Sequence, residues 1–166
     1  MSFSVRHAVA DDLPAIADIA IAAYSGYVAA MGREPAPMRA DFAAHLADDW
    51  LFVAEADSGI AGYMVLCEVN GAWWLDNIAT APECRGAGLG RLLVGWAEDW
   101  LSQRTDRVQL YTNVAMASNL GWYERLGYRQ TGRRVVDGFD RVYFEKYLTR
   151  QKNLKLRAIH VYAIPF

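Results

Sequence analysis

The residues best suited to chemistry lie in a glycine-rich stretch near the middle of the chain. It reads Arg85-Gly86-Ala87-Gly88-Leu89-Gly90-Arg91 and comes directly before apolar residues of helical spacing. Glycines let the main chain turn sharply with no side chain in the way, and the unpaired amides at a helix N-terminus attract anions. Flanking guanidinium groups strengthen such a site. The stretch therefore predicts binding of a phosphate or pyrophosphate group.

Two other phosphate-binding motifs fit this stretch less well. A Walker loop ends in Lys followed by Ser or Thr, whereas this stretch ends in Arg91. A dinucleotide fingerprint needs the spacing GxGxxG within a parallel strand–helix–strand unit, but here the glycines alternate and follow two expected hairpins. A tight turn that only packs the helix closely against a strand is the structural alternative.

The elements that must position this stretch follow from hydrophobic periodicity and turn residues. Strands are expected over Phe3–Val9, Leu51–Ala56, Ile60–Glu68, Ala72–Thr80, Val108–Val114, Tyr128–Val135 and Phe139–Leu148. Helices are expected between Asp12 and Gly26 and over Met38–Ala47, Gly88–Gln103 and Ser118–Leu126. Asn70-Gly71 and Asp137-Gly138 are typical of tight hairpin turns. This order predicts an α/β (α+β) fold in which helices flank a mixed, mostly antiparallel sheet.

With these elements around it, the glycine-rich stretch resembles the signature of a known family. Arg85–Gly90 matches the R/Q-x-x-G-x-G/A motif of the GCN5-related N-acetyltransferases, the GNAT superfamily. The strand before it, Leu75–Pro82, resembles the family's lead-in, and Asn119–Tyr128 resembles its late helix with a YExLGF-type ending. The resemblance extends from about Ser4 to Leu148 and implies a GNAT-like acyl-CoA transferase fold.

The resemblance divides the chain into a GNAT-like N-acetyltransferase domain, residues 1–148, and a C-terminal extension of unknown role, residues 149–166. The extension begins with basic residues, Arg150, Lys152, Lys155 and Arg157, and ends in a more apolar run. It could cover an exposed sheet edge, pair with a second copy in a homodimer, or have no role.

The resemblance also implies which residues hold the co-substrate, acetyl-CoA. Its pyrophosphate would lie on the amides of Gly86, Ala87, Gly88, Leu89, Gly90 and Arg91, beside Arg85. Its pantetheine arm would pair with the main chain of Ile78, Ala79 and Thr80 like an added strand, with the thioester where the fourth strand splays from the fifth. The family often has an asparagine seven residues before its active-site tyrosine, where this chain has Met116. Asn119 or Asn113 is expected to take over that polar contact.

The implied reaction is acetyl transfer to a primary amine through a tetrahedral intermediate. Tyr123 matches the family's tyrosine near the coenzyme sulfur and could protonate the departing thiolate; a core-facing aromatic is the alternative. An amine of pKa ~10.4 is mostly protonated at pH 7, a deficit of roughly 4–5 kcal/mol, so a general base is needed. Asp76 and Glu68 are the candidate bases, and water molecules could replace either. The alternative function is a non-catalytic CoA-binding regulatory or interaction module.

The sequence indicates the acceptor-binding residues less specifically than it indicates the residues that bind acetyl-CoA. In this family the region between the first helix and the second strand usually lines the acceptor pocket, which implies roles for Tyr24, Tyr27, Arg33 and Glu34. Glu34 would suit a cationic head group, whereas Arg33 would suit an acceptor with a carboxylate. The acceptor could thus be a small amine, an amino acid or a peptide N-terminus.

Composition and charge argue against several classes of binding partner. Of the 166 residues, 54% are hydrophobic types and 22% are charged, which is typical of a packed soluble domain. The net charge of −2 argues against nucleic-acid and membrane partners. Cys67 and Cys84 form no zinc motif, and His7, His45 and His160 are expected to be structural, so no metal is expected. A cytoplasmic location is expected.

Overall fold

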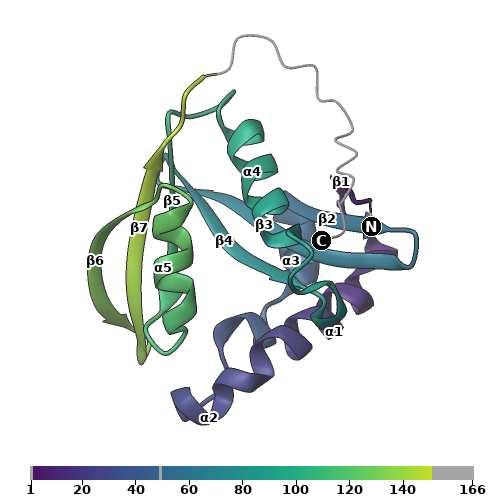
Figure 1. Ribbon diagram of the computed structural model, residues 1–166, viewed down its shortest axis with the longest axis horizontal. Coiled ribbons are helices and arrows are strands. Elements are labelled where there is room, and N and C mark those ends of the chain that lie inside the picture. Colours follow the sequence, from purple (N-terminus) through teal and green to yellow (C-terminus); the bar gives the residue numbers. More distant parts are fainter. Residues whose placement is uncertain (1, 49, 151–166) are drawn as a thin grey trace.

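A seven-stranded sheet forms the centre of the computed structural model, which describes residues 2–48 and 50–150 (Figure 1). Its strands are β1 (Ser4–His7), β2 (Trp50–Ala56), β3 (Gly59–Val69), β4 (Ala72–Thr80), β5 (Arg107–Asn113), β6 (Arg129–Val136) and β7 (Phe139–Tyr147). They lie in the order β1-β2-β3-β4-β5-β7-β6, and all neighbours are antiparallel except the parallel pair β4 and β5. Both predicted hairpin turns are confirmed, with Asn70 and Asp137 at φ 52°. The predicted mixed, mostly antiparallel sheet is confirmed as well.

Helices cover both faces of the sheet. They are α1 (Leu13–Tyr24), α2 (Val28–Met31), α3 (Phe42–Asp48), α4 (Leu89–Leu101) and α5 (Ala117–Arg125). Successive residues of β3 show the two faces, because Tyr63 packs edge-on against Phe42 of α3 whereas Gly62 faces Leu93 of α4. α4 and α5 lie next to each other on the second face (Figure 1). The flanking helices expected from the sequence are therefore present.

The differences from the predicted elements lie between α1 and β2. The helix expected from Met38 begins at Phe42, because two prolines hold Ala36–Arg39 in a short 3-10 helix. The loop expected before it contains the one-turn helix α2, which ends at Gly32 in the left-handed conformation (φ 68°). Glycine adopts this conformation without strain, so the chain can turn sharply at the end of the helix.

The C-terminal extension expected over residues 149–166 is described only at Thr149 and Arg150. Residues 151–166, and with them His160, lie outside the described part of the chain. The roles weighed for the extension, including a homodimer contact, stay predictions.

One helical stretch, Ala10–Met31, is long and apolar enough, by length and composition alone, to cross a membrane. Within it, Ile16, Ile19 and Ala20 of α1 are buried in the core of the domain. A helix that packs on the core of a globular domain has such an apolar face because that face is buried. The expectation that the chain has no membrane partner stays a prediction.

β4 and β5 are hydrogen-bonded for only a short distance. Their register pairs join Trp73–Leu75 to Val108–Leu110, and beyond these pairs the two strands diverge (Figure 1). Asp76 follows directly as the extra residue of a β-bulge, opposite the step between Val65 and Leu66 of β3. The sheet is therefore open between the second halves of β4 and β5.

Gly62 lies where β3, β4 and α4 approach one another closely. A methyl group added there would lie 2.9 Å from the Ala79 carbonyl oxygen and 3.2 Å from Leu93 Cδ1. Because the carbonyl belongs to the backbone of β4, it cannot move away without disturbing the sheet. We expect Gly62→Ala to lower the free energy of unfolding by about 1–3 kcal/mol, measured by urea denaturation.

Gly95→Ala is the matched control. Gly95 lies inside α4, and a methyl group added there meets nothing within 4 Å. Alanine is favoured over glycine inside a helix by about 1 kcal/mol, so this variant should be more stable than the wild type. Equal stability of the two variants would contradict the close packing described at Gly62.

Candidate functional site

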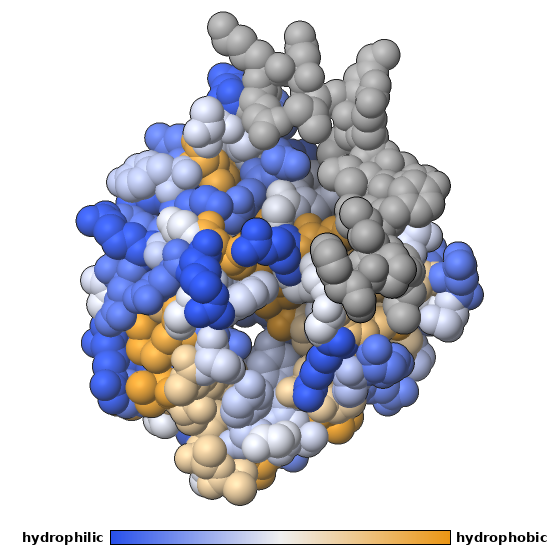
Figure 2. All heavy atoms as spheres, in the orientation of Figure 1, coloured by the Kyte–Doolittle hydropathy of each residue, from blue (hydrophilic) through white to orange (hydrophobic). Residues whose placement is uncertain are grey.

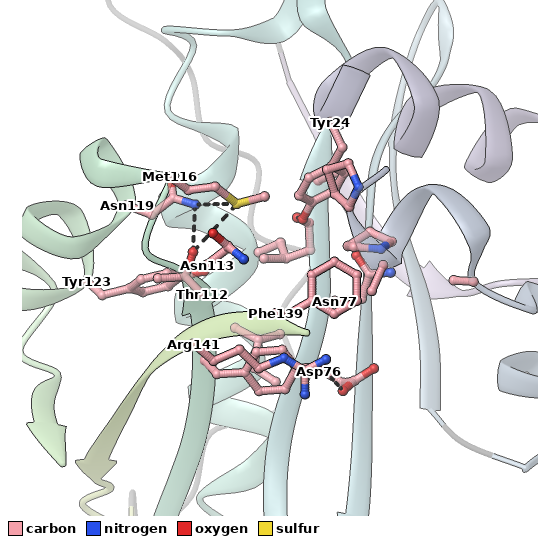
Figure 3. A pocket seen from close by; sticks show the side chains of 18 of the residues that line it. Tyr24, Asp76, Asn77, Thr112, Asn113, Met116, Asn119, Tyr123, Phe139 and Arg141 are labelled. Carbon is pink, nitrogen blue, oxygen red and sulfur yellow. Dashed lines mark hydrogen bonds between the residues drawn. The ribbon is translucent and has the colours of Figure 1, made fainter. Parts of the chain in front are cut away.

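A cavity of about 470 Å³ opens where β4 and β5 diverge (Figure 3). Its walls come from the end of α1, the loop after α2, the second half of β4, the end of β5, the start of α5 and the start of β7. Its lining includes Tyr24, His45, Asp76, Asn77, Tyr111, Thr112, Asn119, Tyr123, Phe139 and Arg141. The molecular surface is hollowed near the centre of the view in Figure 2. Charged, amide, hydroxyl and aromatic groups thus meet in one place.

A second cavity, of about 450 Å³, lies beside the first and reaches the glycine-rich turn. It is lined by residues 22–27, by Ile78–Thr80 at the end of β4, by Arg85 and by Asn119. Tyr24, Ile78–Thr80 and Asn119 line both cavities, so the two compartments meet at the end of β4. At this junction the Tyr24 hydroxyl donates a hydrogen bond of 2.7 Å to the Ile78 carbonyl.

The glycine-rich stretch forms a tight turn into α4. Gly86 and Gly88 have φ values of 79° and 77°, and nothing lies within 4 Å of a side chain built on either residue. None of the described side chains caps the helix, and its first hydrogen bond runs from the Leu92 amide to the Gly88 carbonyl. The amides of Leu89–Arg91 precede that bond and can donate to an anion.

Two arginines stand beside the turn. Arg85 and Arg91 are both exposed, so their guanidinium groups are free to swing toward a bound anion. The Ala87 amide already donates to the Cys84 carbonyl at 3.2 Å, so this one predicted amide ligand has a partner within the turn. The open space, the helix N-terminus and the two cations together fit a pyrophosphate group.

Tyr123 of α5 lines the first cavity and is only 5% exposed. Its ring packs against Trp122, Tyr128 and Phe144, at centroid distances of 4.9, 5.7 and 5.9 Å. Burial raises the pKa of Tyr123 above that of free tyrosine, so its hydroxyl stays protonated at neutral pH. The residue therefore combines a core contact on its ring with a position at the cavity wall.

A small polar cluster surrounds the position at which the family often has asparagine (Figure 3). The Met116 sulfur lies 3.7 Å from Thr112 Oγ1 and 3.8 Å from Asn119 Nδ2, and Asn119 Nδ2 donates to Thr112 Oγ1 at 3.2 Å. Asn113 uses its side chain within its own turn, where Oδ1 accepts from the Ala115 amide at 2.9 Å. Of the two residues predicted to replace the asparagine, Asn119 is the one that lines both cavities.

Asp76 reaches the first cavity from the bulge of β4. The Tyr111 hydroxyl donates to Asp76 Oδ1 at 3.3 Å, and burial, with the nearby charge of Asp76, raises the pKa of Tyr111 to about 12. Arg141 of β7 stacks on the same tyrosine, with its Cζ 4.3 Å from the ring centroid. The cavity thus presents a carboxylate and a guanidinium group around the Tyr111 ring.

Other predicted residues lie outside the first cavity. Glu68 is exposed near the end of β3, and the hairpin register places it away from Asp76. Tyr27 lines the second cavity but not the first. Glu34 forms an ion pair with Arg39 on the surface, at 3.2 Å. Because neither Glu68 nor Glu34 lines either cavity, neither carboxylate is placed to contact a ligand there.

Arg33 links two segments that both contribute residues to the wall of the first cavity. Its Nη1 donates to the Asp137 carbonyl at 2.9 Å, and its Cζ lies 3.9 Å from the centroid of the Phe139 ring. The loop after α2 is thereby joined to the β6–β7 hairpin, 104 residues further along the chain. The hydrogen bond is exposed, so the link is worth on the order of 1 kcal/mol and can open and close.

Three residues line the cavity that the sequence did not indicate as site residues. Tyr111 and Arg141 meet because β5 pairs with β7, an arrangement that no local pattern encodes. Strand alternation predicts the face of β5 on which Tyr111 lies, but the residue that Tyr111 meets on that face depends on the order of the strands in the sheet. His45, expected to be structural, lines the cavity from α3 and also packs near Phe42 at 6.2 Å. Within the described residues, no group of three or more His, Cys, Asp or Glu is placed to hold a metal ion.

Comparison with known proteins identifies a family model and relatives that match this chain. A family model described as an acetyltransferase (GNAT) domain matches residues 47–130. Peptidyl-lysine N-acetyltransferase YjaB of Escherichia coli is 31% identical over 94 residues, or 57% of this chain and 58% of that protein. Mycothiol acetyltransferase of Tsukamurella paurometabola is 35% identical over 86 residues, or 49% of this chain and 30% of that protein. The match spans less than two thirds of either relative.

Solved structures share the fold over nearly the whole chain. The ribosomal-protein-S18-alanine N-acetyltransferase of Escherichia coli superposes with a TM-score of 0.71 at 22% identity, covering 93% of this chain and 99% of that one. A GCN5-related N-acetyltransferase from Rhodopseudomonas palustris gives 0.75 at 19% identity, covering 89% and 97%. These likenesses show that the strand order and the flanking helices are those of the GNAT fold.

The link made by Arg33 can be tested by hydrogen–deuterium exchange. Arg33→Ala removes both the hydrogen bond to Asp137 and the stacking on Phe139. We expect exchange to become faster in the hairpin around Asp137 and in the loop after α2, while β2 and β3 keep their protection. The melting temperature should change by only a few degrees, because the link is worth on the order of 1 kcal/mol.

Arg39→Ala is the matched control for this experiment. Arg39 lies in the same loop and forms its ion pair with Glu34, at exposed positions away from the hairpin. Its loss should leave exchange in the hairpin unchanged. If both variants accelerate exchange there equally, the loop is loosened in general and Arg33 does not link the two segments.

Proposed function

Because this chain belongs to the GNAT acetyltransferase family, we propose that it transfers the acetyl group of acetyl-CoA to the primary amine of a small molecule or peptide. One observation carries this proposal: two compartments meet at the end of β4, one beside an anion-binding turn and one lined by Tyr123 and Asp76. The names of the relatives refer to a peptidyl lysine and to mycothiol, so they do not fix the acceptor.

The second compartment suits the coenzyme. The amides of Leu89–Arg91, with Arg85 and Arg91, would receive the pyrophosphate at the start of α4. The main chain of Ile78–Thr80 lies on the edge of β4 that β5 leaves open, and an extended pantetheine arm can add there as a strand does. The Ile78 carbonyl already accepts from Tyr24, but a carbonyl oxygen has a second lone pair for a further donor.

The first compartment suits the amine. An alkylamine must lose a proton before it can attack, and Asp76 is the carboxylate at the cavity wall that can accept it, directly or through water. The Tyr111 hydroxyl holds Asp76 Oδ1 by a hydrogen bond. Asp76 lies two residues before Ile78 on the same strand, so the base and the open strand edge are close together. The amides of β4 beyond the bulge can stabilise the oxyanion.

Tyr123 acts on the leaving thiolate as a neutral hydrogen-bond donor. Burial raises its pKa, so complete transfer of its proton to a thiolate, whose conjugate thiol has a pKa of about 8.5, is uphill. A hydrogen bond to the sulfur still stabilises the negative charge that develops there. The sequence-based role of proton source is thereby refined to donation of a hydrogen bond, with the net proton supplied by the amine.

Gly88→Glu tests the coenzyme site. The substitution adds a negative side chain at the start of α4, in space that is open at Gly88. We expect the affinity for coenzyme A to fall by well over tenfold, because like charges repel and the side chain fills the anion site, measured by isothermal titration calorimetry. Wild-type affinity in this variant would remove the turn from the binding site.

Gly71→Glu is the matched control. Gly71 has φ 79°, close to the 77° of Gly88, and also has nothing within 4 Å of an added side chain. The backbone strain, about 1–2 kcal/mol, is therefore similar in the two variants, but Gly71 lies in the β3–β4 hairpin turn. Coenzyme A should bind this control as it binds the wild type. A similar loss of affinity in both would point to strain instead of the anion site.

Tyr123→Phe tests the donor to the thiolate. The ring and its packing are retained, so only the hydroxyl is lost. We expect kcat to fall by about 10²–10³-fold with the best amine acceptor, as when a donor to a developing anion is removed, while coenzyme A affinity stays within about threefold. Release of the coenzyme A thiol gives kcat. Since burial raises the pKa of Tyr123, wild-type activity should not fall through its ionisation anywhere between pH 7 and about pH 9.

Tyr128→Phe is the matched control for Tyr123→Phe. Tyr128 is also buried, 4% exposed, and it lines neither cavity. Loss of its hydroxyl should lower the melting temperature and leave kcat nearly unchanged. If Tyr123→Phe behaves in the same way, Tyr123 is a packing residue and the thiolate is stabilised by another group.

A further inference from the structure

We propose that the acceptor is a free α-amino acid with an apolar side chain, whose carboxylate binds Arg141. This inference rests on the proposed acetyltransferase activity and names the substrate class of the same site. It follows from three features of the first cavity: a stacked guanidinium group, a carboxylate on the same tyrosine, and a link between two segments of its wall.

Arg141 is held in a position that suits a carboxylate. Its guanidinium carbon lies 4.3 Å from the centroid of the Tyr111 ring and 5.6 Å from that of Phe139. Stacking on aromatic faces leaves the N–H groups at the edge of the guanidinium plane, where a carboxylate can accept two parallel hydrogen bonds. Arg141 is partly buried and lines the cavity, so a ligand meets a cation that is already fixed in orientation.

The neighbouring arginines differ from Arg141 in their partners. Arg129 pairs with Glu145, and Arg133 pairs with Asp140 at 2.7 Å. None of the ion pairs formed within the described part of the chain uses Arg141. The charge of this arginine therefore faces the cavity, where a ligand can meet it.

The second feature concerns the amine. Asp76 accepts a hydrogen bond from the Tyr111 hydroxyl, while Arg141 stacks on the ring of the same residue. A negative and a positive group thus flank one tyrosine at the cavity wall, and Figure 3 shows Asp76 and Arg141 near each other. In an α-amino acid a single carbon separates the ammonium from the carboxylate, so the two charges match this arrangement. A simple alkylamine would bring no carboxylate for Arg141 to bind.

The third feature disfavours an extended peptide. Arg33 joins the loop after α2 to Asp137 of the β6–β7 hairpin, and residues of both segments line the cavity, so a peptide that passed between them would have to break this link, at a cost on the order of 1 kcal/mol. A peptide N-terminus also carries a neutral amide where a free amino acid has its carboxylate, so it gives Arg141 no charge to bind. Met31, Pro35 and Phe139 make this part of the cavity wall apolar, which favours an apolar side chain.

The reaction balances without a further reactant. The ammonium form of the amino acid loses one proton to Asp76 or to water, and the free amine attacks the thioester carbon. A C–N bond forms and the C–S bond breaks. The products are an N-acetyl amino acid, the coenzyme A thiol and one proton, since the second amine proton offsets the protonation of the thiolate.

The test compares matched acceptors with the wild-type full chain. Leucine, methionine and phenylalanine are each assayed beside their α-amides, their decarboxylated amines and a dipeptide that begins with the same residue. We expect kcat/KM for the free amino acids to exceed that for each amide by at least about 30-fold, because only the acid pairs with the guanidinium group. Thiol release and mass spectrometry of the product give the two readouts.

Arg141→Gln and Arg141→Lys extend the test to the residue. The glutamine variant should lower kcat/KM for the acids by about 10²-fold, mainly through KM, and leave kcat/KM for the amides nearly unchanged. The lysine variant, which keeps the charge but not the planar fork, should lie between them. Arg134→Gln is the matched control: Arg134 pairs directly with Arg141 across β6 and β7 and stacks on Tyr143 at 4.1 Å, but it lines neither cavity.

The outcomes separate this inference from the proposed function. Transfer to amides or dipeptides as fast as to free amino acids would overturn the inference and leave the acetyltransferase activity standing. Equal losses for acids and amides in Arg141→Gln would do the same. Absence of transfer to every amine tested, with coenzyme A still bound, would instead overturn the proposed function.

Discussion

β4 and β5 share only three register pairs, and the site follows from the point at which that pairing ends. Up to Leu75 the backbone of β4 is bonded on both sides, by β3 and by β5. Beyond Leu75, among the described strands, only the β3 side stays paired, which leaves an open strand edge inside the sheet. Polar backbone groups at such an edge need partners, and the Tyr24 hydroxyl provides one for the Ile78 carbonyl. The rest of the edge suits an extended ligand that adds as a strand.

The part of the sheet formed by β5, β7 and β6, which diverges from β4, holds two arginines in fixed positions. On one face, Tyr111 of β5 and Tyr143 of β7 form a layer with Trp74 of the neighbouring β4, with ring centroids 5.7–6.4 Å apart. Arg134 and Arg141 stack on that layer at 4.1 and 4.3 Å. Each such contact is worth about 0.5–2 kcal/mol, enough to hold an arginine in one orientation without burying its charge. Of the two arginines, Arg141 is the one that the strand order places at the cavity.

Local signals predicted the elements well, and the acceptor side depended on contacts that local signals do not carry. Glycine spacing and the Asn-Gly and Asp-Gly turns reflect backbone conformations that few other residues adopt, so they are readable from a single sequence. Glu68 and Asp76 are both candidate bases by sequence, but the register of β3 and β4 pairs Glu68 with Trp73 and keeps the two carboxylates apart. The sequence offered Arg33 as a cation for an acceptor with a carboxylate, but Arg33 joins the loop after α2 to the β6–β7 hairpin. Arg141 lines the cavity instead, because β7 pairs with β5. Register and strand order are properties of the whole sheet, so no window of sequence contains them.

The positions of the acid and base groups also decide how protons move in the proposed reaction. Asp76 lies in a bulge and is only partly buried, so a proton that it accepts from the amine can pass to water. Tyr123 is 5% exposed, and burial keeps its pKa high, so it can donate a hydrogen bond but not readily a proton. The two groups come from different elements, β4 and α5, on either side of the open strand edge. Deprotonation of the amine and stabilisation of the thiolate therefore need not compete for one residue, and the rate at neutral pH should depend on the ionisation of the base side alone.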